Sequence, residues 1–323
     1  MTPPSPPPRR TTSIIFPIRR ATTITPAPSR SSAGSSSSTA SPDQARAGSR
    51  VLLLGDPVGH SLSAAFQNAG FEAAGIAAVY QPRQVSAADL PQVLDEIRRD
   101  PDVLGANITI PHKITVASLL DGLGPDAQQL GAVNTLSHRG QVLVGWNTDR
   151  TGFAQALEDA GYDPRRRAAL VLGAGGAARA VVDVLRSTAS RVWVAARNLE
   201  QARRLCRDLN VEAGGPTPFG SLKLVVGRVD LIVNATPVGL DGHSLVFPAD
   251  WLNADHFVFD LLYNPPLTPL VRAARDHGAR AVNGLAMLLY QGLASFEIWT
   301  GRPAPEAAMR AALERAVLGS AAP

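Results

Sequence analysis

The chain has little cysteine, little lysine and no long apolar run. Its single cysteine, Cys206, excludes a disulfide framework and a cysteine-based zinc site, and we expect no metal. No apolar stretch is long enough for a signal peptide or a membrane span. These absences fit a protein of a reducing compartment, so we expect a cytoplasmic location and no membrane partner.

Lysine is rare, because Lys113 and Lys223 are the only lysines among 31 basic residues. Arginine stays protonated in proteins, whereas a lysine amine can give and take a proton. An isolated lysine is usually a solvated surface residue. Lys113, however, ends the polar cluster Asn107-Ile108-Thr109-Ile110-Pro111-His112-Lys113, which follows an apolar run. We therefore treat Lys113 as a candidate acid/base.

Positive charge is concentrated at the N-terminus. Residues 1–50 hold seven arginines and one acid, Asp43, so they carry +6 and leave −2 for residues 51–323 out of a total of +4. The remainder is slightly acidic, and we expect no nucleic-acid partner. Residues 1–49 are rich in Pro, Ser and Arg and are predicted to be a disordered extension. An extension without a role is favoured over an organellar transit peptide or a basic tail.

The chain has 323 residues, enough for two domains. From Val51 onward, short apolar runs alternate with helix-like segments, and Thr148 is expected to cap a helix that ends near residue 160. This rhythm predicts an α/β fold with a mostly parallel sheet covered by helices. The expected strands are 51–55, 78–80, 103–108, 132–137 and 142–146, and the expected helices are 63–75, 87–99 and 113–120.

A second α/β unit begins near Ala168, and Gly214-Gly215-Pro216 is predicted to be a loop within it. Two helices are expected to end the chain, at 285–299 and 305–318. The expected strands of the unit are 168–172, 192–195, 229–233, 257–261 and 279–282, and its expected helices are 176–186 and 199–209.

A glycine-rich turn opens the second unit. It follows a predicted strand, precedes a predicted helix and fits the pattern G-x-G-x-x-G/A, which indicates dinucleotide binding. Gly173 permits the tight turn, Gly175 lets the backbone approach a pyrophosphate, and Ala178 allows close helix packing. A glycine turn that serves backbone geometry alone is the simpler alternative. The cofactor residues predicted here are Gly173, Ala174, Gly175, Gly176 and Ala177.

The end of the next strand indicates which dinucleotide is bound. An NAD site places Asp or Glu there for the ribose 2′-hydroxyl, whereas this strand ends in Val194-Ala195-Ala196-Arg197 without an acid. A guanidinium suits the 2′-phosphate of NADP. We therefore predict NADP (NADPH) as the cofactor, with Arg197 on its 2′-phosphate.

Polar residues gather at the ends of several apolar runs, where α/β proteins place their ligands. Ser61, Ser63 and Thr148 could simply cap helices, and the Asn and Asp residues could serve turns. Together they suit a small ligand with hydroxyl and carboxylate groups. Reduction of a ketone needs a proton donor at the developing alkoxide, which a lysine such as Lys113 can supply with Asp149 to orient it. The members of this set are His60, Ser61, Ser63, Asn107, Thr109, Asn134, Thr135, Asn147, Thr148 and Asp149.

These motifs, in this order, resemble the shikimate dehydrogenase family from about Val51 to Pro305. The matching segments are Gly55–Ser63, Asn107–Lys113, Gly131–Thr135, Gly145–Asp149, the Gly173 turn, Asn234–Gly239, Asp260–Pro265 and the C-terminal Gly284, Met287 and Gln291. The resemblance implies a substrate domain of residues 50–149 and 285–323. It also implies a Rossmann domain of residues 150–284, with the site in the cleft between them. The implied reaction is the reversible NADPH-dependent reduction of 3-dehydroshikimate to shikimate in chorismate and aromatic amino acid biosynthesis.

The resemblance also implies residue roles. Lys113 and Asp149 are the catalytic pair; Ser61 and Ser63 hold the substrate carboxylate with Tyr263. The substrate hydroxyls are expected to bind Asn107, Asn134, Asp149 and Gln291, and Thr109 is a further candidate. Thr236, Gly284 and Met287 lie near the nicotinamide. The expected assembly is a monomer or homodimer.

The chain departs from the family pattern at Ala64 and Gln67, which stand where Pro and His are usual, and around Arg197. There the usual Asn-Arg-Thr and second basic residue become Ala196-Arg197-Asn198 and Gln201; Arg203 or Arg204 could compensate. Three alternatives stay open: a quinate/shikimate dehydrogenase using NAD, an aminoshikimate relative, and a non-catalytic sensor that binds shikimate-like ligands.

Overall fold

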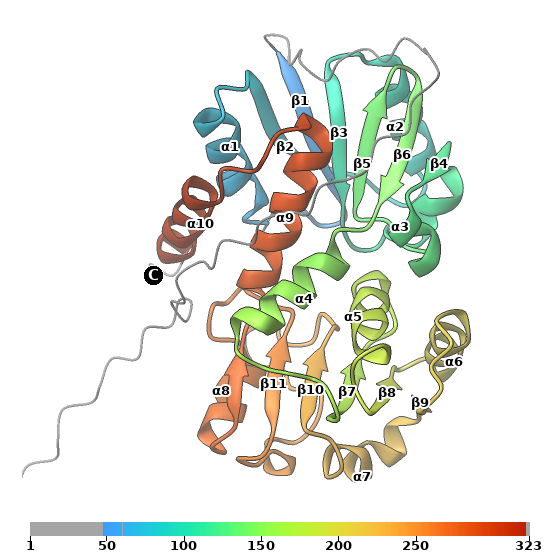
Figure 1. Ribbon diagram of the computed structural model, residues 1–323, viewed down its shortest axis with the longest axis vertical. Coiled ribbons are helices and arrows are strands. Elements are labelled where there is room, and N and C mark those ends of the chain that lie inside the picture. The colour runs from blue at the N-terminus through green and yellow to red at the C-terminus, as the bar shows by residue number, and fades with distance from the viewer. Residues whose placement is uncertain (1–47, 60, 321–323) are drawn as a thin grey trace, which may run out of the picture.

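The computed structural model describes residues 48–59 and 61–320 and contains two six-stranded sheets, one above the other in Figure 1. Residues 1–47 of the predicted extension lie outside the described residues. Helices cover both sheets, so the predicted α/β class is confirmed. The chain crosses from the first sheet to the second through helix α4 (Asp149–Asp159) and returns through α9 (Leu285–Thr300) and α10 (Glu306–Ser320).

The first sheet is mostly parallel, with strand order β2-β1-β3-β5-β6-β4. Only β5 runs antiparallel to its neighbours β3 and β6. The loops at the carboxyl ends of the parallel strands of this sheet therefore gather residues that lie far apart in the sequence. The strands are β1 (Ser49–Gly55), β2 (Ala78–Gln84), β3 (Val103–Ile108), β4 (Gly122–Leu123), β5 (Thr135–Arg139) and β6 (Val142–Trp146).

Alternate residues of β1 face opposite cores, as strand geometry requires. Val51 and Leu53 pack with α1 (Ser63–Ala73) and with the C-terminal helices α9 and α10. Leu52 and Leu54 pack with α2 (Leu90–Arg99). A strand buried on both faces reads as an unbroken apolar run, which explains the run at the start of the described chain.

The second sheet is entirely parallel, with strand order β12-β11-β10-β7-β8-β9. Numbered within this unit, the order is 6-5-4-1-2-3, which is the Rossmann order, and dinucleotides bind where it reverses. That point lies between β7 and β10. The strands are β7 (Ala168–Leu172), β8 (Arg191–Ala195), β9 (Gly214–Thr217), β10 (Leu231–Asn234), β11 (Phe257–Asp260) and β12 (Arg280–Val282).

Helices cover both faces of this sheet. The face that includes Ala169 and Val171 packs against α5 (Gly176–Arg186) and α6 (Leu199–Asp208). The face that includes Leu170 and Leu172 packs against α7 (Leu222–Val226) and α8 (Pro269–Asp276).

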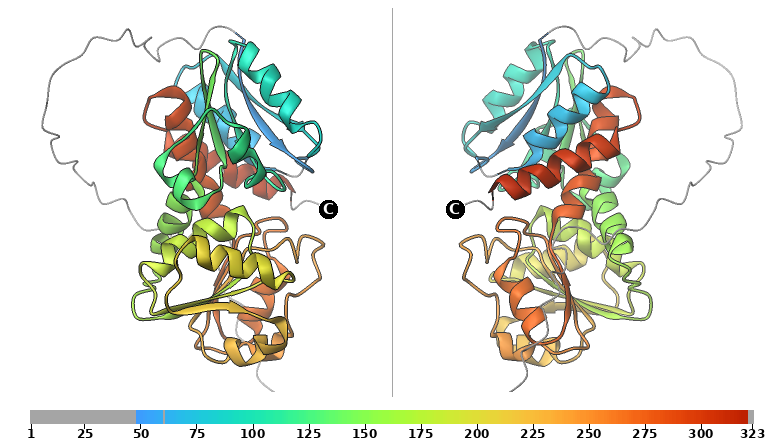
Figure 2. Two further views of the ribbon diagram at one scale, coloured as in Figure 1. Left: turned by 90° about the vertical axis from the view of Figure 1, so that its right-hand side faces the viewer. Right: turned by 90° about the vertical axis from the view of Figure 1, so that its left-hand side faces the viewer.

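Helices α4 and α9 lie side by side near the level where the two sheets' units meet, and α9 continues along the first sheet (Figures 1 and 2). At Gly152 on α4, an added Cβ would lie 2.8 Å from Gln291 Cβ and 2.9 Å from the Met287 carbonyl oxygen. Glycine is therefore what lets the two helix backbones approach. This close packing places Asp149, at the start of α4, near the predicted substrate residue Gln291 of α9.

Two of the expected elements are wrong. The expected helix at 113–120 is a 3₁₀ turn, Thr115–Leu119, in which the Lys113 carbonyl accepts the Val133 N–H at 2.7 Å in place of the N–H four residues further on. The expected loop at Gly214-Gly215-Pro216 belongs to strand β9. Since β9 is an edge strand, its proline loses no ladder hydrogen bond. The short strand expected at 78–80 also extends to Gln84 and includes Pro82, again on an edge.

Candidate active site

Lys113 and Asp149 form an ion pair, with 2.5 Å between Lys113 Nζ and Asp149 Oδ2. The side chains are 15% and 5% exposed, respectively. The turn carrying Lys113 is fixed by its carbonyl bond to Val133 and by His112, whose ring nitrogen Nε2 lies 2.6 Å from the Val85 carbonyl. Asp149 is the first residue of α4. The structure therefore brings the predicted acid/base and its predicted partner together from segments 36 residues apart.

Asn134 connects the Lys113–Asp149 pair to the predicted substrate residue Gln291. Its amide Nδ2 donates to Asp149 Oδ1 and to Gln291 Oε1, both at 3.1 Å. Nδ2 also lies 2.8 Å from Thr148 Oγ1, and Thr148 makes no side-chain cap to α4. The capping role expected of Thr148 is therefore wrong, because its hydroxyl is used inside the site.

Asn107 has little hydrogen-bonding capacity left for a ligand. Its Oδ1 accepts from the Tyr80 hydroxyl at 2.8 Å, and its Nδ2 donates to the Asn134 carbonyl at 3.0 Å. Thr135 and Ser295 hydroxyls also lie 3.1 and 3.2 Å from Nδ2. An amide oxygen has two lone pairs and an NH₂ group two hydrogens. Asn107 can therefore offer a ligand only the second lone pair of Oδ1, as an acceptor.

The predicted carboxylate-binding serines lie at the start of α1: Ser61 precedes the helix and Ser63 is its first residue. Ser61 Oγ accepts the Ser63 N–H at 3.2 Å, and the cap position of α1 is Leu62, which makes no side-chain cap. Ser61 thus bonds the first N–H of α1, as the capping alternative expects, whereas Ser63 lies inside the helix and does not cap it. Burial raises the pKa of Tyr263, and hydrogen bonds from the Ser61 hydroxyl and the Leu62 backbone oppose that rise. The three predicted residues Ser61, Ser63 and Tyr263 thus gather at one place.

Thr109 follows β3 and is partly exposed, beside the predicted serine loop. Its N–H donates to the Leu54 carbonyl at 2.9 Å, and its methyl group lies where a side chain at Gly55 would stand. The hydroxyl of Thr109 makes no described hydrogen bond within residues 48–59 and 61–320. It therefore stays a candidate ligand group.

The glycine turn lies against the catalytic turn. Gly173 has φ +110°, and an added Cβ would lie 2.7 Å from the Ala235 carbonyl, so only glycine fits. At Gly175 an added Cβ would meet nothing within 4 Å. At Gly176 it would lie 2.5 Å from Lys113 Cβ. Helix α5 begins here without a side-chain cap, which leaves backbone N–H groups for an anion.

Arg197 lies exposed at the end of β8, as predicted, with no ion pair to another described residue. Asn198 caps α6 by accepting the N–H groups of Glu200 and Gln201. The two arginines that could replace the usual second basic residue form ion pairs with acids near α6. Arg203 lies 3.4 Å from Glu200, and Arg204 lies 3.9 Å from Asp208.

The remaining predicted cofactor residues lie at the same edge of the second sheet. Thr236 follows β10 and donates its hydroxyl to Asn234 Oδ1 at 2.7 Å. Gly284 precedes α9, and its N–H donates to the Leu262 carbonyl at 2.9 Å. Met287 is buried on the first turn of α9. Thr236 adjoins the glycine turn, since an added Cβ at Gly173 would lie 3.3 Å from its methyl carbon, whereas Gly284 and Met287 lie where α9 begins.

Sequence reasoning missed two residues beneath the site, Tyr80 and Ser295. Both are buried and bond to Asn107, as does Thr135 of the predicted polar set. Ser295 also donates to the Gln291 carbonyl at 2.9 Å, four residues earlier on α9. A serine one helical turn from Gln291 in a mostly apolar helix was a usable signal. Tyr80 gave none, because a tyrosine in a strand reads as an ordinary core residue.

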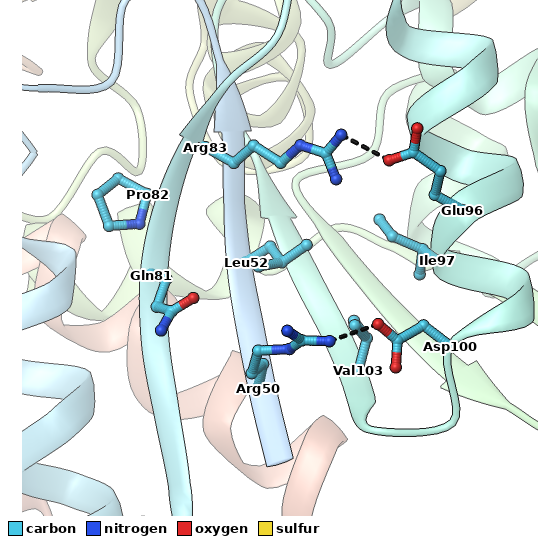
Figure 3. Close-up of a pocket in the computed structure, with 9 residues that line it drawn as sticks. All are labelled: Arg50, Leu52, Gln81, Pro82, Arg83, Glu96, Ile97, Asp100 and Val103. Carbon is cyan, nitrogen blue, oxygen red and sulfur yellow. Dashed lines mark hydrogen bonds and ion pairs between the residues drawn. The ribbon is translucent and has the colours of Figure 1, made fainter. Parts of the chain in front are cut away.

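A pocket of about 350 Å³ lies elsewhere, between β2 and α2 (Figure 3). Two ion pairs, Arg50–Asp100 and Arg83–Glu96, cross it, so its charges cancel. Arg50 and Val103 come from the amino ends of their strands, opposite the loops that hold Lys113. The pocket is therefore separate from the predicted site. Its lining consists of Arg50, Leu52, Gln81, Pro82, Arg83, Glu96, Ile97, Asp100 and Val103.

Across residues 48–59 and 61–320, no cluster of His, Cys, Asp and Glu is arranged to hold a metal ion. Within the same ranges, each helix is too short or too polar to span a bilayer.

Comparison with known proteins identifies the family. Residues 53–136 match the model of the shikimate dehydrogenase substrate binding domain, residues 155–240 that of shikimate / quinate 5-dehydrogenase, and residues 284–314 that of the shikimate 5'-dehydrogenase C-terminal domain. The shikimate dehydrogenase (NADP(+)) of Moorella thermoacetica is 41% identical over 276 residues, which are 83% of this chain and 93% of the relative.

Solved structures agree with these matches. Shikimate 5-dehydrogenase from Thermus thermophilus, in complex with NADP(H) and shikimate, is 36% identical with a TM-score of 0.74, covering 83% of this chain and 99% of that one. Quinate dehydrogenase from Corynebacterium glutamicum, in complex with NAD, is 30% identical with a TM-score of 0.75 and the same coverage. The chain therefore belongs to the shikimate dehydrogenase family.

Proposed function

We propose that this protein catalyses the reversible NADPH-dependent reduction of 3-dehydroshikimate to shikimate, an oxidoreductase reaction at a CH–OH group. The observation that carries the proposal is the Lys113–Asp149 ion pair, 2.5 Å long, at the point where Gly176 of the glycine turn adjoins Lys113. The proposed proton donor and the proposed dinucleotide-binding turn therefore lie side by side. The known relatives bear the same activity in their names.

Lys113 is the proposed acid/base. Its ammonium donates a proton to the alkoxide oxygen as the ketone is reduced, and its amine accepts that proton when shikimate is oxidised. One of its hydrogens is held by Asp149 Oδ2, which orients the amine and leaves two hydrogens for the substrate. Asn134 holds the other carboxylate oxygen of Asp149 and so fixes its plane.

Most of the proposed substrate contacts use groups with hydrogen-bonding capacity to spare. The hydroxyls of Ser61, Ser63 and Tyr263 hold the carboxylate at one end of the substrate. Asn107 accepts from a substrate hydroxyl through Oδ1. Gln291 has one hydrogen left on Nε2, since the other bonds the Leu288 carbonyl at 2.7 Å. Asp149 and Asn134 contact the hydroxyls nearest Lys113, and Thr109 is a further donor at the rim. Because both polar atoms of the Asn134 amide are already bonded within the protein, a substrate hydroxyl replaces one of those partners.

The residues present fit the implied cofactor, NADP, which supplies or accepts the hydride when it is bound. Open space at Gly175 and uncapped N–H groups at the start of α5 suit a pyrophosphate. Gly173, Ala174, Gly176 and Ala177 complete this turn. Arg197 is proposed to bind the 2′-phosphate, while Thr236, Gly284 and Met287 border the nicotinamide.

We also propose the predicted domain division, with residues 50–149 and 285–323 binding substrate and residues 150–284 binding cofactor. It is supported by the placement of β1–β6 before Asp149 and of β7–β12 after it. A place in chorismate and aromatic amino acid biosynthesis, a cytoplasmic location and a monomeric or homodimeric state complete the proposal. Shikimate and NADP are its only proposed partners; a membrane or nucleic-acid partner is not proposed.

An absorbance assay of reduced nicotinamide tests the proposal. Purified protein is given shikimate or quinate, each with NADP or NAD. We expect shikimate with NADP to give the highest kcat/KM. Absence of turnover with all four pairs, together with measurable shikimate binding, would contradict an enzymatic role and favour the sensor.

The NAD-linked quinate/shikimate dehydrogenase is the second candidate, and one observation favours it. Glu200 at the start of α6 pairs with Arg203 and also with Arg207, at 3.1 Å, and its carboxylate partly offsets their positive charge near the place proposed for a 2′-phosphate. Comparable kcat/KM with NAD, or with quinate, would select this candidate.

A further inference from the structure

One face of α5 is fixed to the elements around the substrate site. Gly176, Arg179 and Asp183 are spaced by three and four residues, so they lie in one stripe along the helix. Gly176 adjoins Lys113 at the start of the helix. The stripe continues from the glycine turn, where the cofactor is proposed to bind, toward the C-terminal end of α5.

Arg179 joins α5 to α3 (Pro125–Leu130) of the first sheet's unit. Its side chain is 8% exposed, and its Nε donates to the Leu130 carbonyl at the end of α3. Its Nη2 forms an ion pair with Asp208 of α6 at 2.7 Å. Gly131, with φ +58°, ends α3 beside this guanidinium: an added Cβ would lie 3.4 Å from Nη2. A buried guanidinium thus spans the two sheets' units.

Asp183 is the second connection, and its side chain is 1% exposed. Oδ1 accepts from Gln129 of α3 at 2.8 Å and pairs with Arg186 at 2.7 Å. Oδ2 pairs with Arg150 of α4 at 2.7 Å. Arg150 directly follows Asp149, the partner of Lys113. A single buried carboxylate therefore ties the cofactor helix both to α3 and to the helix that carries the catalytic aspartate.

We propose that Asp183 is a positioning residue that, beside the link made by Arg179, holds the glycine turn, and hence the nicotinamide, at a fixed place relative to Lys113. The inference rests on the proposed function and adds a residue that touches neither substrate nor cofactor. Hydride transfer depends steeply on the alignment of donor, acceptor and acid, and a 1 Å displacement costs up to about 10²-fold in rate. Loosening α5 from α3 and α4 is therefore expected to slow the chemical step more than it weakens substrate binding.

The chain offers a matched control. Arg150→Gln and Arg186→Gln each remove one guanidinium from Asp183, but only Arg150 lies on another helix; Arg186 lies on α5 itself. Gln129→Ala removes the contact to α3 from an exposed side chain. The test compares Asp183→Asn, the double variant R150Q/Q129A and the control R186Q in the full-length protein. The double variant keeps the test valid if Asp183→Asn fails to fold.

Three quantities are measured: steady-state kcat and KM, the single-turnover rate of NADPH formation from shikimate, and amide hydrogen exchange of α3 and of the first turn of α5. We expect kcat and the single-turnover rate to fall at least about tenfold in D183N and R150Q/Q129A, with KM values within about threefold of wild type. Exchange should rise in both segments. R186Q should stay within about twofold of wild type in rate and unchanged in exchange.

Wild-type rates in R150Q/Q129A, or an equal loss of rate in R186Q, would overturn the inference. A wild-type protein without turnover would instead refute the proposed function. Hydrogen exchange then still tests the connection, because increased exchange in the double variant but not in R186Q supports it and unchanged exchange overturns it.

Discussion

Replacing Lys113 tests the proposed chemistry most directly. Lys113→Ala removes the proposed acid/base and leaves the Asp149 carboxylate without its cation. Positioned proton transfer contributes about 10²–10⁴-fold to rate, so we expect kcat to fall by at least about 10²-fold. Shikimate affinity should stay within several-fold, because the carboxylate and hydroxyl contacts lie on other residues.

The structure also predicts a cost in stability. Breaking a fully buried ion pair costs about 3–5 kcal/mol, because one charge stays buried without a partner. Asp149 is 5% exposed but keeps its bond to Asn134, and Lys113 is 15% exposed, so water can replace the lost ammonium. We therefore expect Lys113→Ala to lose about 1–3 kcal/mol of unfolding free energy. In the double variant K113M/D149N both charges are absent, and most of this loss should be recovered.

Three assays separate the two effects: shikimate oxidation followed through NADPH absorbance, shikimate binding by calorimetry, and urea unfolding. The double variant should regain stability but remain as inactive as Lys113→Ala. Turnover of Lys113→Ala above about a tenth of wild type would refute the acid/base role. A double variant no more stable than the single one would refute the coupling of the two charges.

Three further changes have distinct expected outcomes. Gly175→Ala should weaken NADPH binding at least about tenfold without lowering Tm, because the added Cβ meets only the space proposed for the pyrophosphate. Gly176→Ala should also lower Tm, since its Cβ meets Lys113. Equal NADPH binding in Gly175→Ala and wild type would contradict the proposed pyrophosphate position. Arg197→Gln should lower kcat/KM for NADP by about 10–100-fold, because a charge-assisted hydrogen bond is worth about 1.5–3 kcal/mol. The kcat/KM for NAD, which lacks the 2′-phosphate, should stay within about threefold of wild type. An equal loss with NAD would contradict the 2′-phosphate contact. Burial raises the pKa of Asp260 to about 6 from 3.8, so folding favours its protonated form and wild-type stability falls as pH rises through this window. Asp260→Asn lacks this penalty, and its unfolding free energy relative to wild type should rise by about 3 kcal/mol between pH 3.5 and pH 7 in urea titrations; a constant difference would contradict the raised pKa.

The Rossmann unit was predictable because its signals are local. The run Ala168–Leu172 gave β7 at its observed bounds, and Gly176–Arg186 gave α5 likewise. The backbone of Gly173 needs a positive φ and a close approach to Ala235, and both requirements are visible in the sequence as glycine. Residue type and spacing thus carried the information.

Local signals failed where a distant partner decides the backbone. Lys113–Leu120 looks helical, but the Val133 N–H takes the Lys113 carbonyl and leaves a 3₁₀ turn. Gly214–Pro216 looks like a loop, but pairing with β8 makes it a strand. Thr148 has the residue type of a helix cap, but the Asn134 amide engages its hydroxyl.

The sequence by itself determined the α/β class, the glycine turn, the unusual lysine and the order of the motifs, because each depends on residue type or on neighbours within a few positions. Only the tertiary structure decided that Lys113 meets Asp149, that Asn107 retains a single acceptor position, and that Asp183 ties α5 to α3 and α4. These contacts join residues from 27 to 188 positions apart. Their geometry follows from sheet order and helix packing, which no local pattern specifies.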